Sequence, residues 1–465
     1  MKKTFWSSLL LATALSTTAN AQSIFEALSS AYETNPTLQA QRAYLRSIDE
    51  NVAIAKSGYR PSLALTGSYT DASVDSNVEP KNQDNDKTIL AATISQPLFN
   101  GFSTVNSVKS ADSTVRAQQN NLYNVEQTVF LDASTAYLDV LQNTAIVDLQ
   151  KNNEKLLKKR LDETVERFNV GEVTRTDVSQ ARARYSQARS DRIAAEGDLE
   201  ASKSTYTKII GAAPDKLKSP EIGAFLPKTF EEALDYAKMN NYGVKYAKDI
   251  LNSKTYDVAT NTGALLPQVT LDGSISNTKT SGDMYDRDPD VDSAEIGINM
   301  TIPLYNSGES RAKIRQSKYL KWQAQEQVLR KRDHPHQLIG NVLEAERKAV
   351  ADVTSAWEYM VANRAKIKSI KDQVKANEIA LDGVQKEEAL GNRTILDVLD
   401  AYQELLNSNV EEVKARRNYY VSGMNVLMAM GKLTAEDLKL NVDIYNPKKY
   451  YKETRDKWLS LSVEK

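Results

Sequence analysis

The strongest constraint on the fold is an internal duplication of the sequence. The segment Gly171–Ala181 recurs 220 positions later as Gly391–Ala401, with Gly, Thr, Asp, Val and Ala at matching places. Both segments lie between long helical patterns, so Gly171 and Gly391 are predicted to form the turns at two helix tips. Matches at a fixed spacing indicate a repeated structural unit. Two further pairs repeat 206 positions apart: Pro61–Gly67 with Pro267–Gly273, and Pro97–Asn100 with Pro303–Asn306.

The duplication divides the chain into two copies of one unit. We expect a first repeat at 22–211, a linker at 212–228, a second repeat at 229–431 and a C-terminal tail at 432–465. The tail contains several tyrosines and a tryptophan, and we expect it to pack near the middle of the helices. No chemistry is indicated there.

The first 21 residues have the three parts of a secretory signal. Two lysines precede a largely apolar stretch from Phe5 to Leu15, and Ala19 and Ala21 provide the small residues of a cleavage site. The alternative interpretation is a short buried helix. With a signal, the mature chain begins at Gln22, outside the cytoplasm.

The second copy is longer than the first. Between Leu329 and Glu346 the spacing of the matches rises from 207 to 220 positions, so 13 residues are extra there. We predict an insertion at 333–345 that loops out of a long helix, because Pro335 interrupts helical hydrogen bonding. The insertion holds both histidines, His334 and His336. A metal site is the alternative, but two histidines without a third ligand make a poor one.

Each copy contains two segments in which apolar and polar residues alternate. A period of two predicts β-strands, each about ten residues long, which is the length of a strand that crosses an outer membrane. A soluble sandwich would show the same alternation. The acidic connections 71–88 and 278–293 are predicted to be solvated loops. The four alternating segments are 61–70, 89–98, 268–275 and 296–302.

The remainder of each copy has the pattern of long helices. Residues 104–168 contain neither Pro nor Gly, and the return run 174–210 is rich in Ala and Ser. An ordinary coiled coil is compatible with this pattern. Beyond residue 21 we find no apolar run long enough for a transmembrane helix, so a membrane role would have to use the strands.

The composition argues against several function classes. The net charge of −1 gives no reason to expect nucleic acid as a partner. The chain has no Cys, and we find no nucleophile–base pattern, no phosphate-binding loop and no metal cluster. We therefore predict that the protein is not an enzyme and binds no cofactor or metal.

Four strands cannot close a sheet by themselves. An open sheet edge in lipid leaves backbone groups unpaired, at several kcal/mol each. The smallest spanning barrels have about eight strands. A membrane role would therefore require an oligomer in which several chains contribute strands around one axis.

Taken together, the duplicated layout, the paired Pro-Leu-aromatic-Asn segments and the Gly391–Ala401 tip resemble the TolC-type outer-membrane efflux family over residues 22–431. The resemblance implies a mixed α/β membrane protein of mostly long α-helices with four β-strands per protomer. Three protomers would form a homotrimer with a twelve-stranded β-barrel in outer-membrane lipid and an α-barrel in the periplasm. It also implies an exit duct for small-molecule efflux, type I protein secretion or both, opened at the tips by a periplasmic adaptor and an inner-membrane transporter.

The same resemblance assigns roles at the tips. The pore constriction would fall on Asp397 and Asp400, and the network that closes the tips on Arg393 with Thr176 and Asp177. Glu388 stands where the family has a Tyr of that network. A capping box is the alternative role for Asp177 and Asp397, since each follows a Thr by three residues. Capping does not explain Asp400, which lies on the same helix face as Asp397.

One other function class competes with a duct. A periplasmic coiled-coil adaptor or scaffold would have the same long helices but no strands that face lipid. Fractionation separates the two, because a duct partitions with outer membranes and requires detergent.

Overall fold

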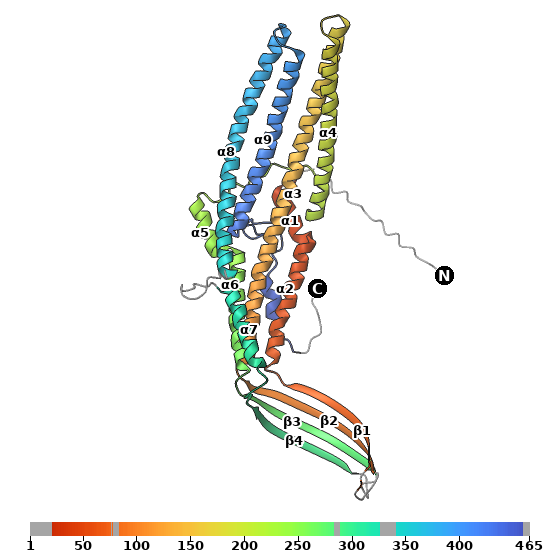
Figure 1. Cartoon of the computed structure of the whole chain (residues 1–465), viewed down its shortest axis with the longest axis vertical. Coiled ribbons are helices and arrows are strands. Elements are labelled where there is room, and N and C mark those ends of the chain that lie inside the picture. Colours follow the sequence, from red (N-terminus) through yellow and green to blue (C-terminus); the bar gives the residue numbers. More distant parts are fainter. Residues whose placement is uncertain (1–20, 76, 78–82, 283–288, 326–340, 459–465) are drawn as a thin grey trace, which may run out of the picture. The chain divides into compact units, whose positions relative to one another are not determined.

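The computed structural model describes residues 21–75, 77, 83–282, 289–325 and 341–458. The first copy contains two helices, two strands and two long helices, and the second copy repeats this order with two helices, α7 and α8, in place of the first long one (Figure 1). The internal duplication is therefore confirmed. The first copy comprises α1 (Ile24–Thr34), α2 (Pro36–Ser57), β1 (Ser62–Val74), β2 (Gln83–Asn100), α3 (Ser103–Asn169) and α4 (Arg175–Ile210).

In the second copy, two helices take the place of α3. Helix α7 ends at Ala324 and α8 begins at Asn341, so residues 341–345 of the predicted loop are helical. The rest of the expected insertion, including His334 and His336, lies outside the described residues. The elements are α5 (Phe230–Asn240), α6 (Tyr242–Gly263), β3 (Gln268–Gly282), β4 (Asp290–Thr301), α7 (Glu309–Ala324), α8 (Asn341–Ala389), α9 (Ile395–Met430) and, in the tail, α10 (Pro447–Thr454).

The described chain forms two compact units, and each unit takes segments from both copies. One unit comprises the described residues up to 36 together with 126–232 and 353–443, and the other comprises 37–125, 233–352 and 444 onward. The first unit holds the tips, and the second holds the sheet. The two compact units therefore do not correspond to the two copies of the sequence.

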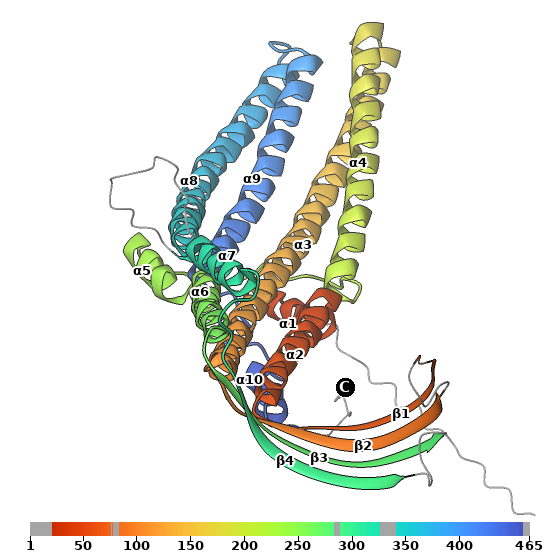
Figure 2. The same ribbon diagram turned by 60° about the horizontal axis from the view of Figure 1, so that its bottom comes forward.

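The sheet in the second unit is antiparallel, with the order β1-β2-β3-β4 (Figure 2). Its central pair joins β2 of one copy to β3 of the other, with Ala92 opposite Ile275. The strands are longer than predicted, and the prediction of loops is wrong for residues 71–74, 83–88, 278–282 and 290–293. Backbone ladder bonds continue there because strand pairing does not require apolar side chains.

One face of this sheet is apolar and exposed in the protomer. Leu63 on β1 is 78% exposed and Ile296 on β4 is 78% exposed, whereas the opposite face carries polar groups. On the polar face the carboxylate of Asp272 accepts hydrogen bonds from Ser95 at 2.5 Å and from Asn299 at 2.7 Å. None of the helices in the described residues combines the length and apolarity that a bilayer crossing requires.

The tail contacts the helices of the second unit. Tyr450 donates a hydrogen bond to Glu50 on α2 at 2.9 Å, and Tyr451 donates to Asp112 on α3 at 2.6 Å. The guanidinium of Arg60 lies 4.7 Å from the centre of the Trp458 ring. The aromatic residues of the tail thus attach it along α2 and α3.

The first unit is held together by side chains from all four long helices. Leu157 of α3, Ala188 of α4 and Leu399 of α9 form one buried cluster. A second cluster joins Ile370 and Val374 of α8 to Ala415 of α9. The small alanines allow the helix backbones to approach closely. The first cluster connects the hairpin α3/α4 to α9, and the second packs α8 against α9 within the other hairpin.

Candidate functional site at the two helix tips

Each hairpin turns through a glycine with left-handed backbone. Gly171 has φ +82° and Gly391 has φ +80°, a region in which a side chain is strained. The turn after α3 is closed by a backbone bond from Glu172 to the carbonyl of Arg167, at 2.9 Å. The turn after α8 is closed in the same way, from Asn392 to Glu387, at 2.9 Å. These bonds satisfy carbonyl groups at the helix ends.

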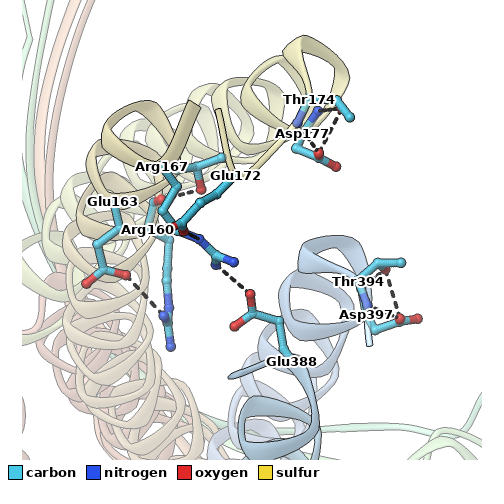
Figure 3. A network of polar contacts seen from close by, with 10 residues as sticks. Arg160, Glu163, Arg167, Glu172, Thr174, Asp177, Glu388, Thr394 and Asp397 are labelled. Atoms are coloured by element: carbon cyan, nitrogen blue, oxygen red, sulfur yellow. Dashed lines mark hydrogen bonds and ion pairs between the residues drawn. The ribbon is translucent and has the colours of Figure 1, made fainter. Parts of the chain in front are cut away.

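A capping box starts the helix that leaves each tip (Figure 3). The hydroxyl of Thr394 accepts from the backbone N–H of Asp397 at 3.2 Å, and the carboxylate of Asp397 accepts from the N–H of Thr394 at 2.9 Å. Thr174 and Asp177 form the same box on α4. The backbone and hydroxyl bonds from Thr394 lower the pKa of Asp397, so this carboxyl stays ionised at neutral pH.

An ion pair joins the two hairpins near their tips. Arg167 at the end of α3 donates to Glu388 at the end of α8 at 2.6 Å, and Figure 3 shows the two side chains pointing toward each other. The Glu388 side chain is only 13% exposed. The hydrogen bond to Glu388 raises the pKa of Arg167 above its ordinary value. Arg167 also contacts Glu172 in its own turn, at 3.3 Å.

Within the protomer, Arg393 and Glu388 have partners other than those expected for the network that closes the tips. Arg393 pairs with Glu387 at 2.9 Å, because the tip turn brings these two residues of one hairpin together. The structure does not bring Arg393 to Thr176 or Asp177: Thr176 is exposed and Asp177 is engaged in its capping box. Glu388 contacts the other hairpin, but its partner is Arg167.

The two candidate constriction carboxylates have different surroundings. Asp397 is held in its capping box, whereas Asp400 receives a hydrogen bond from Arg184 of α4 at 2.5 Å. The side chains of Asp400 and Arg184 are 54% and 37% exposed. This second ion pair therefore also joins the two hairpins, and both of its side chains are in contact with solvent.

A third contact between the hairpins centres on Tyr402 of α9. Its hydroxyl accepts from Arg160 of α3 at 3.2 Å and is hydrogen-bonded to Gln385 of α8. Farther from the tips, Arg417 of α9 pairs with Asp139 of α3 at 2.8 Å. The sequence alone did not point to Arg160, Arg167 or Arg184. No local pattern marks the ion pairs, since the partners lie 216 or 221 positions apart on different helices.

Nothing in the described residues points to a metal centre. No group of three or more His, Cys, Asp or Glu side chains gathers there in a way that would hold an ion. The chemistry of the tips is that of ion pairs, capped helix starts and exposed carboxylates.

Comparisons with known proteins bear on this arrangement. The sequence profile of the family described as "Outer membrane efflux protein" matches the chain twice, over residues 27–212 and 234–432. The outer membrane efflux protein BepC of Brucella suis is 36% identical over 445 residues, covering 95% of this chain and 92% of BepC. The outer membrane protein TolC of Escherichia coli is 25% identical over 442 residues, covering 91% of this chain and 85% of TolC.

A solved structure shows the same fold. The CmeC outer membrane channel of Campylobacter jejuni superposes with a TM-score of 0.76 at 15% identity, covering 93% of this chain and 89% of CmeC. The expected resemblance and the expected combination of long helices with four antiparallel strands are thus confirmed.

Proposed function

This chain belongs to the outer membrane efflux protein family, and from that premise we propose that three copies form one exit duct for small-molecule efflux, type I protein secretion or both. As a family member it is an outer-membrane transport protein and not an enzyme. The proposal concerns the assembly, the gate and the partners. The duct is a homotrimer, and a periplasmic adaptor and an inner-membrane transporter open it at the helix tips.

The open four-stranded sheet carries the proposal of a trimer. In the described chain β1 and β4 each pair with only one strand, and their exposed face is apolar. Unpaired backbone groups in lipid cost several kcal/mol each. Pairing β1 of one protomer with β4 of the next removes both edges. Three protomers then supply twelve strands, which is enough to close a barrel around a channel.

The ion pairs at the tips support the proposal of a gate. Arg167–Glu388 and Arg184–Asp400 are contacts between the two hairpins of a protomer. Opening the duct requires the hairpins to separate, and the adaptor and transporter provide the free energy that breaks these contacts. Asp397 and Asp400 line the narrowest point, while Arg393, Thr176 and Asp177 contact one another between neighbouring protomers. Gly171 and Gly391 form the turns on which the gate is built.

The assembly is tested by mass and by conductance. We expect the detergent-corrected mass of the purified protein to equal three protomers, and we expect channels in planar bilayers. A mass of one protomer, or a trimer without conductance, contradicts the duct.

The gate is tested by weakening the less exposed partner of the first ion pair, Glu388. Glu388→Gln removes the charge that Arg167 contacts, so the closed tips lose a contact and the mean conductance should rise severalfold. Glu378→Gln, an exposed carboxylate on the same helix α8, is the matched control and should behave like the wild type. Equal conductance of the two variants counts against a closing role for Glu388.

A further inference from the structure

The ion pair Arg184–Asp400 changes the charge at one of the two candidate constriction residues. A bare pair of carboxylates, Asp397 and Asp400, would give each protomer two negative charges at the entrance. The guanidinium of Arg184, a positively charged group, lies 2.5 Å from the carboxylate of Asp400. The three groups together therefore have a net charge of −1 per protomer, and of −3 in a trimer.

The position of Arg184 is fixed by packing and not by the ion pair alone. Tyr185, next to Arg184 in the chain, and Ile395 pack against the buried cluster of Leu157, Ala188 and Leu399. Leu399 directly precedes Asp400, and Ala188 lies one helical turn beyond Arg184. This apolar contact between α4 and α9 brings the guanidinium and the carboxylate together while both remain in contact with solvent.

Two exposed partners of this kind add little to stability, because water screens the attraction. Their effect on ions that pass nearby is larger, because the potential at an entrance depends on the sum of the charges around it. From this we propose that Arg184 is a specificity-determining residue of the duct, which neutralises Asp400 while α4 contacts α9 and so limits the cation preference of the closed entrance. This inference rests on the proposed function, in which Asp397 and Asp400 line the entrance.

The contact also links the selectivity of the duct to its gate. Separation of α4 from α9 withdraws the guanidinium and leaves Asp400 unpaired. The entrance then gains one negative charge per protomer as it widens. In the closed duct, Arg184 therefore makes the entrance less cation-selective than Asp397 and Asp400 alone would. When the duct opens, the loss of this pairing makes the entrance more cation-selective.

The inference is tested by reversal potentials of purified trimers in planar bilayers across a KCl gradient. Arg184→Gln adds a net charge of −3 to the trimer and should raise the ratio of potassium to chloride permeability about twofold at 0.1 M salt, from the screened Coulomb interaction. The effect should shrink at 1 M salt, where the Debye length is about 3 Å. Arg184→Lys keeps the charge and should behave like the wild type.

A double variant separates charge from structure. Arg184→Gln combined with Asp400→Asn removes one charge of each sign, so the wild-type permeability ratio should return. A merely structural role for the ion pair predicts that the double variant stays altered. The matched control is Arg182→Gln, which removes the same charge from an exposed position of α4 about 160° around the helix and should leave the ratio unchanged.

The possible failures are distinguishable. If Asp400→Asn lowers the cation preference but Arg184→Gln leaves it at the wild-type value, Asp400 lines the entrance and the role of Arg184 is wrong. If both variants conduct with unaltered selectivity, Asp400 does not line the entrance and the inference is also wrong. A wild-type protein that forms no conducting trimer overturns the proposed function itself.

Discussion

At the residue scale, Asp49 is the side chain least explained by its sequence context. It lies on α2, is 0% exposed, and in the described part of the chain neither of its carboxyl oxygens has a hydrogen-bond partner. Burial, and then the neighbouring charge of Glu50, raise the pKa of Asp49 to about 7. A buried carboxyl without partners disfavours its charged form. We infer that Asp49 is largely protonated in the folded protein below neutral pH.

The raised pKa predicts a pH dependence of stability. Between pH 3.8 and about 7 the folded protein binds more protons at Asp49 than the unfolded chain does, so stability falls as pH rises through that window. The slope approaches about 1.4 kcal/mol per pH unit for one group. Asp49→Asn removes this contribution and should raise the thermal stability at pH 8 more than at pH 5. Thermal unfolding of purified trimers at the two pH values measures this difference in stability. The control is Asp162→Asn, which changes an exposed carboxyl. Parallel pH profiles of thermal stability for the wild type and Asp49→Asn would count against the raised pKa of Asp49.

At the scale of elements, the duplication allows the two roles of Asp397, capping α9 and lining the entrance, to be tested separately. Asp397 closes the capping box of α9 and is also proposed to line the entrance, whereas its counterpart Asp177 closes the box of α4. The side chain of the N-cap Thr accepts the N–H of residue N3 in both helices. Because the two boxes have the same geometry, a difference in selectivity between matched variants reports the lining of the entrance, which is proposed for Asp397 and not for Asp177.

We predict that Thr394→Ala and Thr174→Ala lower stability by similar amounts, about 1 kcal/mol each, because each removes one N-cap acceptor. Neither variant removes a charge, so the reversal potential should stay at the wild-type value. Asp397→Asn removes charge as well and should reduce the cation preference, whereas Asp177→Asn should not. Chemical denaturation and bilayer recordings on the four variants provide the comparison. A loss of selectivity in Asp177→Asn as large as in Asp397→Asn would contradict the assignment of the entrance to Asp397.

At the scale of the whole molecule, the two copies of the sequence are not two separate folding units. The two strands of each copy complete their sheet only with the strands of the other copy, through β2 and β3. Likewise, α9 of the second copy shares a buried cluster with α3 and α4 of the first. Each compact unit consequently depends on both copies. The remaining edges, β1 and β4, are the strands that we propose to pair between protomers.

Cross-linking tests how these edges pair. The chain has no Cys, so introduced cysteines are unique. With Leu65→Cys on β1 and Ile298→Cys on β4, both exposed on the apolar face, a short bismaleimide should link protomers into dimers and trimers on denaturing gels. The matched control, Ala92→Cys with Ile275→Cys, places the cysteines opposite each other on β2 and β3 and should link only within a protomer. Monomers alone from the first pair would argue against pairing of β1 with β4.

The features that could be predicted from the sequence alone are those that depend on neighbouring residues or on matched segments. The alternation in 61–70, the helix starts at Thr174 and Thr394, the glycine turns and the duplication all rest on spacings that backbone geometry converts directly into structure. The sequence could not predict the partners of Arg167, Arg184 and Arg393, the burial of Asp49 or the order β1-β2-β3-β4, because the packing of the chain sets them. The partners of Arg167 and Arg184 depend on which helix faces meet when hairpins more than 200 residues apart pack together, whereas Glu387 reaches Arg393 within one tip turn. A guanidinium pairs with whichever carboxylate the packing brings within hydrogen-bond distance, and spacing along the chain does not determine that distance.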